Sequence, residues 1–149
     1  MIKHITGDLF KIAAETKSPI AIAHGCNCFH AMGAGVARRV ALLYPEALEA
    51  DRATPHGAVS QTKLGSISYV RVNPNLMVIN AYTQFYPGAD FRLDAFRSAM
   101  LAIRELTQRP LFIPKIGAGI GGGSWPEIQA VLEQVFEYRD VTVVSLAGG

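Results

Sequence analysis

The stretch that decides the fold reads LFIPKIGAGIGGGSWPEI and covers residues 111–128. It begins with a short apolar strand, Leu111 to Ile113, and passes into a glycine-rich loop over residues 117–123. A helix is expected after Ser124, because Ser124 and Glu127 have the spacing of a capping box. Glycine lets the backbone turn tightly and lets a ligand reach its N–H groups. A helix N-terminus adds unpaired N–H donors and the positive end of the helix dipole, so the stretch predicts an anion-binding turn.

A shorter loop of the same kind lies earlier in the chain. Gly33, Ala34 and Gly35 follow a strand expected over residues 20–24 and open a helix expected over residues 36–44, which Pro45 ends. Two strand–glycine–helix units in one small chain predict a ligand with more than one phosphate.

The remaining segments continue the alternation of strands and helices. Further strands are expected over residues 1–4, 66–72, 76–83 and 142–146, and a short helix over residues 46–53. A long helix with Asp90 as its N-cap is indicated by one apolar face, formed by Leu93, Phe96, Met100, Ile103 and Leu106. The pattern predicts one α/β domain over residues 1–149 with a mixed, mostly parallel sheet.

The amino-acid composition limits the classes of protein to which the chain can belong. The chain has 149 residues, of which 50% are hydrophobic and 17% charged, as expected for a compact globular domain. A net charge of +2 with scattered basic residues gives no strong nucleic-acid signal. Since no apolar run approaches the ~20 residues that span a bilayer, no membrane partner is expected. The two cysteines are too close for a comfortable disulfide and fit a reducing cytoplasm.

The glycines allow other interpretations. Gly117, Gly119 and Gly122 match the GxGxxG pattern of dinucleotide-binding domains, but that fingerprint needs an acidic residue about 20 residues further on. The last expected strand ends at Leu146 and Ala147 without a carboxylate, which argues against that class. A glycine-rich turn that binds no ligand remains an alternative.

The segment HGCNCFH, residues 24–30, places two histidines and two cysteines at alternate positions. Single-residue spacers are tighter than the usual spacing of zinc ligands, so no metal and no cofactor are predicted. A Cys–His nucleophilic pair stays open, with buried cysteines as the alternative. Asp8, just after the first strand, is either an N-cap or turn residue or a carboxylate that accepts hydrogen bonds from a base's amine.

Three ordered segments together resemble the macro domain family, whose members are three-layer α/β/α domains that bind ADP-ribose. They are TGDLF (residues 6–10), HGCN followed by GAGV (residues 24–27 and 33–36), and PKIGAGIG (residues 114–121). The likeness runs from the first strand to the last.

The resemblance implies a role for each matching position. Asp8 would recognise adenine, with Leu9 contributing an adjoining contact, and Asn27 would hold the distal ribose. The two diphosphate loops would be formed by Gly33, Ala34, Gly35 and Val36, and by Gly117, Gly119, Ile120, Gly121 and Gly122. Residues 85–89 are expected to fold over the distal end of the ligand.

The form His24-x-Cys26-Asn27 is similar to the yeast ADP-ribose 1″-phosphate phosphatase branch and to phage-encoded relatives assigned to the same processing reaction. This likeness implies that His24 and Asn27 are catalytic, with His24 moving a proton or orienting water and a buried core histidine as the alternative. Relatives that remove ADP-ribose from acidic side chains use a lysine and an aspartate where this chain has Gln84 and Gly121. That lysine-dependent route is therefore expected to be closed.

The sequence thus predicts a hydrolase that binds ADP-ribose and converts ADP-ribose 1″-phosphate to ADP-ribose and phosphate. Two alternatives remain: a non-catalytic reader of ADP-ribose, and a hydrolase that acts on ADP-ribosylated protein or nucleic acid.

Overall fold

The computed structural model describes residues 2–56, 60–118 and 121–146, and its central element is a six-stranded sheet. The strand order is β1-β6-β5-β2-β4-β3. All neighbours pair in parallel except β3, which is antiparallel to β4. The strands are β1 (Ile2–Thr6), β2 (Ile20–Cys26), β3 (Ile67–Asn73), β4 (Leu76–Tyr82), β5 (Leu111–Ile113) and β6 (Val141–Ser145).

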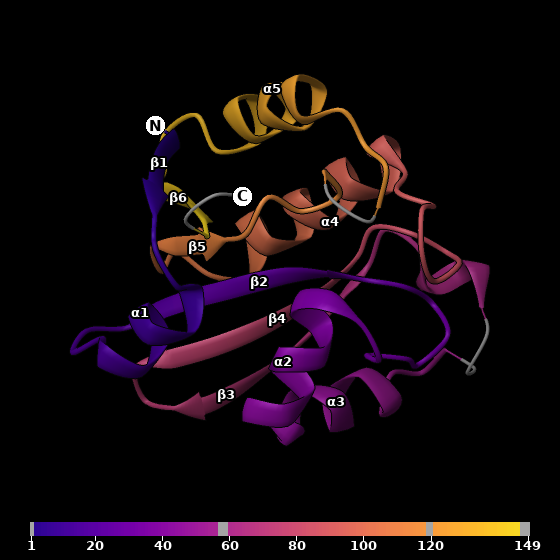
Figure 1. Cartoon of the computed structure of the whole chain (residues 1–149), viewed down its shortest axis with the longest axis horizontal. Helices are drawn as coiled ribbons and strands as arrows, with labels where there is room; N and C mark the ends of the chain where they lie inside the picture. Colours follow the sequence, from indigo (N-terminus) through magenta and orange to yellow (C-terminus); the bar gives the residue numbers. More distant parts are fainter. Residues whose placement is uncertain (1, 57–59, 119–120, 147–149) are drawn as a thin grey trace.

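Helices cover both faces of this sheet (Figure 1). Helices α4 (Leu93–Leu106) and α5 (Trp125–Val135) pack on one face. Helices α1 (Leu9–Glu15), α2 (Gly35–Leu43) and α3 (Pro45–Arg52) lie on the other. A 3₁₀ turn spans Gln61–Lys63. The predicted three-layer α/β/α architecture with a mixed, mostly parallel sheet is confirmed.

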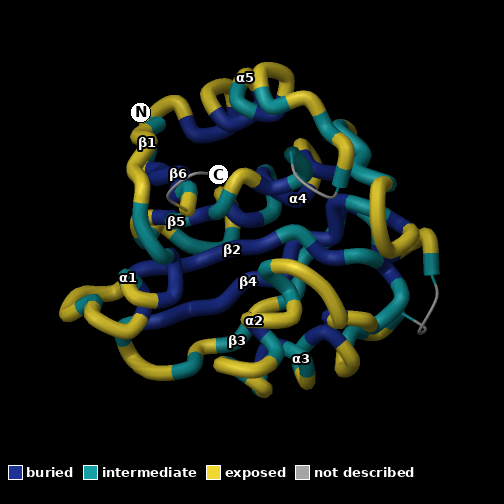
Figure 2. Tube along the Cα trace, in the orientation of Figure 1, coloured by how far each residue is buried: buried dark blue, intermediate teal, exposed yellow. Residues whose placement is uncertain are grey.

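Strand β2 contributes side chains to the hydrophobic cores on both faces of the sheet. Ala21 and Ala23 face α4 and α5, whereas Ile20 and Ile22 face α1, α2 and α3, since side chains alternate along a strand. A strand buried on both faces reads as a continuous apolar run, which residues 20–23 do. The central strands are accordingly dark in Figure 2. Full burial of each isoleucine contributes about 1.5–3 kcal/mol.

One predicted cap is wrong, and another has the predicted position without the capping hydrogen bond. Arg92, not Asp90, is the N-cap of α4, since the helix begins at Leu93. The Asp90 carboxylate instead accepts hydrogen bonds from the backbone N–H groups of Phe85 and Tyr86. Ser124 does occupy the N-cap position of α5, but its side chain accepts no capping bond.

Helix α1 was not predicted as an element. Asp8 caps it by accepting a hydrogen bond from the Phe10 N–H at 2.9 Å, so the N-cap interpretation of Asp8 is correct. The helix has only seven residues, too few to show a clear apolar period.

None of the helices that the structure describes is long and apolar enough to cross a bilayer.

Candidate ligand-binding site

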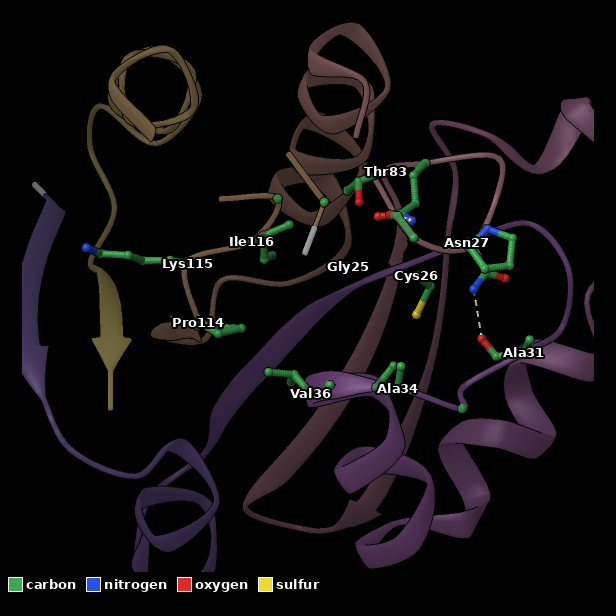
Figure 3. Close-up of a pocket in the computed structure, with 18 residues that line it drawn as sticks. Gly25, Cys26, Asn27, Ala31, Ala34, Val36, Thr83, Pro114, Lys115 and Ile116 are labelled. Atoms are coloured by element: carbon green, nitrogen blue, oxygen red, sulfur yellow. Dashed lines mark hydrogen bonds between the residues drawn. The ribbon is translucent and has the colours of Figure 1, made fainter. Parts of the chain in front are cut away.

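The two glycine loops leave the same edge of the sheet because β2 and β5 are parallel neighbours. A third loop, residues 83–92, leaves that edge from β4 on the other side of β2. Between the three loops lies a cavity of about 470 Å³, within the usual range for small-molecule sites (Figure 3). Its lining comprises residues 25–27, 31, 33–37, 83–84, 87–88, 114–117 and 121.

The first glycine loop brings the N-terminus of α2 to the cavity. Ala34 is the N-cap and has no side-chain oxygen, so no side chain caps this helix. The N–H groups of Gly35, Val36 and Ala37 lack intrahelical partners, because the first turn of any helix does. All three residues line the cavity, and Gly35 adopts a φ of 59°, which favours glycine. An unsatisfied helix N-terminus that faces a cavity is suited to bind an anion.

The second glycine loop folds back on itself beside Phe91. The N–H of Gly123 donates to the carbonyl of Gly117 at 2.6 Å, and Gly117 has a φ of 78°. A Cβ atom at Gly117 would collide with the Phe91 ring, and one at Gly121 would lie 3.0 Å from the Gly117 carbonyl oxygen. The loop can therefore close this tightly only with glycine at these positions.

Gly117 and Gly121 line the cavity, whereas Gly122 does not, although its φ of 79° also favours glycine. Gly119 and Ile120, which the sequence assigned to the same loop, lie outside the described residues.

Asn27 lines the cavity directly after β2. Its Oδ1 accepts a hydrogen bond from the Phe29 N–H at 2.9 Å, and its Nδ2 donates to the Ala31 carbonyl at 3.0 Å (Figure 3). Asn27 thus shapes the chain that leads to the first glycine loop. One amide N–H remains for a ligand, because an asparagine amide carries two.

His24 does not line the cavity and is 1% exposed. Its Nε2 lies 2.6 Å from Oδ1 of Asn80, whose Nδ2 donates to the Ala47 carbonyl and to the Ser68 hydroxyl. Because the Asn80 amide is oriented by those two acceptors, His24 must donate from Nε2. Burial lowers the pKa of His24 from 6.5 to about 4, outweighing the opposing effects of Asn80 and Asp51. A neutral, enclosed imidazole argues against the predicted proton transfer at this position.

A chain of hydrogen bonds continues beneath the site from Ser68. The Ser68 hydroxyl lies 2.7 Å from the Tyr82 hydroxyl, which donates to Oδ1 of Asp51 at 2.7 Å. The same carboxylate oxygen accepts from Nζ of Lys63 at 2.6 Å, and both charged side chains are buried. Lys63 also lies 4.4 Å from the centre of the Tyr82 ring. This buried polar network joins α3, β2, β3, β4 and the 3₁₀ turn.

Asp8 and Leu9 lie apart from the cavity lining. Leu9 is buried in the core beneath α1. Asp8 lines a separate depression between α1 and α2, where its carboxylate lies 3.6 Å from the Arg39 guanidinium. Both side chains of this ion pair are about half exposed. Of the predicted residues, the cavity thus brings together Asn27, residues 33–36, Gly117 and Gly121.

Several cavity residues carried no assigned role in the sequence. Thr83 and Gln84 follow β4, and Pro114 to Ile116 follow β5. Gly25 lies close against two of them, since a Cβ there would be 2.9 Å from Oγ1 of Thr83 and Cγ2 of Ile116. The signal that could have identified these residues is the topology of the sheet. Thr83 and Gln84 directly follow β4, Pro114 to Ile116 directly follow β5, and both strands are neighbours of β2.

Both cysteines are buried, and neither is suited to act as a nucleophile. Burial raises the pKa of the Cys28 thiol to about 11 and raises the pKa of Cys26 well above its usual value. A thiol must ionise to attack efficiently. Within the described part of the chain, no group of three or more His, Cys, Asp or Glu residues could hold a metal ion.

Solved structures place this architecture in a known class of α/β/α domain. The macrodomain of DarG from Mycobacterium tuberculosis superimposes with a TM-score of 0.78 at 22% identity, covering 97% of each chain. A macrodomain protein of Streptomyces coelicolor gives a TM-score of 0.77 at 24% identity, over 97% of this chain and 98% of that one. DarTG of Thermosipho africanus, solved with ADP-ribose, gives 0.74 at 16% identity, over 96% of this chain and 41% of that one.

Sequence relatives add to this finding. An uncharacterized 17.5 kDa protein of phage T4 is 40% identical over 97% of this chain and 96% of its own length. A DNA ADP-ribosyl glycohydrolase of Mycobacterium bovis is 27% identical over the whole chain, which spans 43% of that protein. An ADP-ribose 1″-phosphate phosphatase of Lodderomyces elongisporus is 26% identical over 90% of this chain and 92% of its own. No protein-family model matches the chain. The chain therefore has the fold of the macrodomains.

Proposed function

We propose that this macro domain binds ADP-ribose in the cavity and hydrolyses ADP-ribose 1″-phosphate to ADP-ribose and phosphate. The observation that carries the proposal is the pair of glycine loops from β2 and β5 that line one cavity. Relatives named as hydrolases of ADP-ribose derivatives support the general class of activity.

Strand order gives the proposed direction of the ligand. Asp8 follows β1 at one edge of the sheet, the second glycine loop follows β5, and Asn27 follows β2 beyond it. ADP-ribose would then lie across the carboxyl ends of the strands, with adenine toward Asp8, the diphosphate against the backbone N–H groups and the distal ribose at Asn27.

The proposed reaction is attack of water on the 1″-phosphorus. The water oxygen bonds to phosphorus, the bond from phosphorus to the 1″ oxygen breaks, and a water proton passes to that oxygen. Asn27 would orient the water, and backbone N–H groups would stabilise charge on the phosphoryl oxygens. Among the described lining residues there is no histidine or carboxylate, so the substrate's own phosphate is proposed to take the proton from the attacking water and pass it to the leaving 1″ oxygen.

Calorimetry with ADP-ribose and release of phosphate from ADP-ribose 1″-phosphate test the two parts separately. Asn27→Ala is expected to lower turnover at least tenfold, and Gln108→Met, an exposed change after α4 and away from the cavity, serves as the control. From its burial, we expect His24→Ala to lower stability more than turnover. Binding without turnover would make the protein a reader, and absence of binding at millimolar ADP-ribose would refute the proposal.

A second candidate is removal of ADP-ribose from DNA. It is favoured by the mycobacterial DNA ADP-ribosyl glycohydrolases, whose similarity extends over the entire chain. An ADP-ribosylated single-stranded oligonucleotide tests it: release of ADP-ribose faster than phosphate release from the 1″-phosphate would make DNA the better substrate.

A further inference from the structure

The loop over residues 84–91, which we call the β4 loop, is held in its conformation by hydrogen bonds between two of its own side chains and its backbone. The Nε2 group of Gln84 donates to the carbonyls of Tyr86 and Gly88, each at 2.7 Å. The carboxylate of Asp90 accepts from the N–H groups of Phe85 and Tyr86 at 3.1 and 2.9 Å. These backbone bonds lower the pKa of Asp90, so the carboxylate stays charged at neutral pH.

The same loop is a wall of the cavity. Gln84, Pro87 and Gly88 all line it, and the backbone of Gln84 pairs with that of Phe91 to close the loop at its base. Phe91 also donates its N–H to the Gly121 carbonyl at 3.1 Å, which joins the β4 loop to the second glycine loop.

The chemistry of the Gln84 amide limits what it can offer a ligand. An amide has two N–H donors and one carbonyl acceptor. Both donors are used by Tyr86 and Gly88, and this pattern also fixes which atom is nitrogen. Only Oε1 is left, so a ligand group that meets Gln84 must donate, as a ribose hydroxyl does and an ionised phosphate does not.

We propose that Gln84 is a positioning residue for the distal ribose: its two donated hydrogen bonds hold the β4 loop in place as the wall of that subsite. This inference rests on the proposed function, because it assigns the loop to one end of ADP-ribose. At this position related hydrolases are expected to have a chemically active lysine. In this chain Gln84 would instead shape the site.

Gln84→Met tests the proposal, because methionine keeps the length and neutrality of the side chain but cannot donate. Without ligand, we expect amide hydrogen exchange in the peptide covering residues 85–90 to rise about tenfold, as loss of two hydrogen bonds implies. ADP-ribose should bind about tenfold more weakly, whereas ADP, which lacks the distal ribose, should bind unchanged. A purely structural role would weaken both ligands alike. Gln108→Met should change none of these quantities.

Gln84→Glu provides a second variant, since it keeps acceptor oxygens but removes both donors. Its β4 loop should exchange as fast as that of Gln84→Met. Unchanged exchange in both variants, or equal losses for ADP and ADP-ribose, would overturn the proposal. If the unsubstituted protein binds no ADP-ribose, the proposed function fails, whereas the exchange measurement still decides whether Gln84 holds the loop.

Discussion

Asp8 has two possible roles that a single conservative substitution can separate. As an N-cap it stabilises α1, and as a carboxylate it is proposed to bind adenine. Asparagine caps a helix about as well as aspartate, so Asp8→Asn should change the unfolding free energy by less than about 0.5 kcal/mol. The loss of a charged acceptor should weaken ADP-ribose binding by roughly 1–3 kcal/mol in calorimetry. Unchanged affinity would remove Asp8 from the site.

The second glycine loop depends most directly on the absence of a side chain at Gly117. Gly117→Ala combines a positive φ with a collision against the Phe91 ring. We expect a loss of about 2–4 kcal/mol in unfolding free energy, measured by urea titration. Gly33→Ala is the matched control, because no atom of the residues that the structure describes lies within 4 Å of its Cβ position. Equal stability of the two variants would contradict the described loop geometry.

At the scale of elements, the buried ion pair beneath the site holds α3 and the 3₁₀ turn to the sheet. Lys63→Met would leave the Asp51 carboxylate buried without its cation. Removing one partner of a buried pair costs about 3–5 kcal/mol, which chemical unfolding would measure. The double variant Lys63→Met with Asp51→Asn should recover part of this loss, because no buried charge then remains. Glu105→Gln, in an exposed pair with Arg104, should change stability by less than about 1 kcal/mol.

A double variant no more stable than Lys63→Met alone would contradict this account. It would mean that the Asp51 charge is not what makes the lysine necessary, and that Lys63 acts by packing over the Tyr82 ring.

Element types were predictable from the sequence, whereas the contacts of individual polar side chains were not. The order strand, glycine loop, helix at residues 20–44 and 111–128 is local, so both loops were found before the fold was known. Asp90 also had the local signature of a cap, yet its carboxylate accepts hydrogen bonds from N–H groups of the preceding loop. No property of residues 84–91 taken alone shows that Gln84 binds two carbonyls of this loop while Asp90 binds two of its N–H groups.

At the scale of the whole molecule, His24 illustrates why burial is hard to predict from a motif. Its position beside Cys26 and Asn27 indicated a catalytic group, but its ring is paired with Asn80 of β4. Asn80 is in turn held by Ala47 of α3 and Ser68 of β3. The cavity itself was easier to anticipate, because parallel strands bring their following loops to one edge of a sheet. Which side chains turn into that cavity depends on the packing of both faces.

Burial of His24 also predicts how the stability of the whole domain depends on pH. Between pH 6.5 and about 4 the unfolded chain binds a proton at His24 that the folded protein does not. The unfolding free energy should therefore fall as pH decreases through this window, by about 3 kcal/mol from this residue alone. In His24→Gln the side chain retains an N–H donor but does not titrate, so the variant should lose less stability than the unsubstituted protein between pH 7 and pH 4. Urea unfolding at several pH values measures the difference, and parallel profiles for the two proteins would show that His24 is accessible to protons in the folded state.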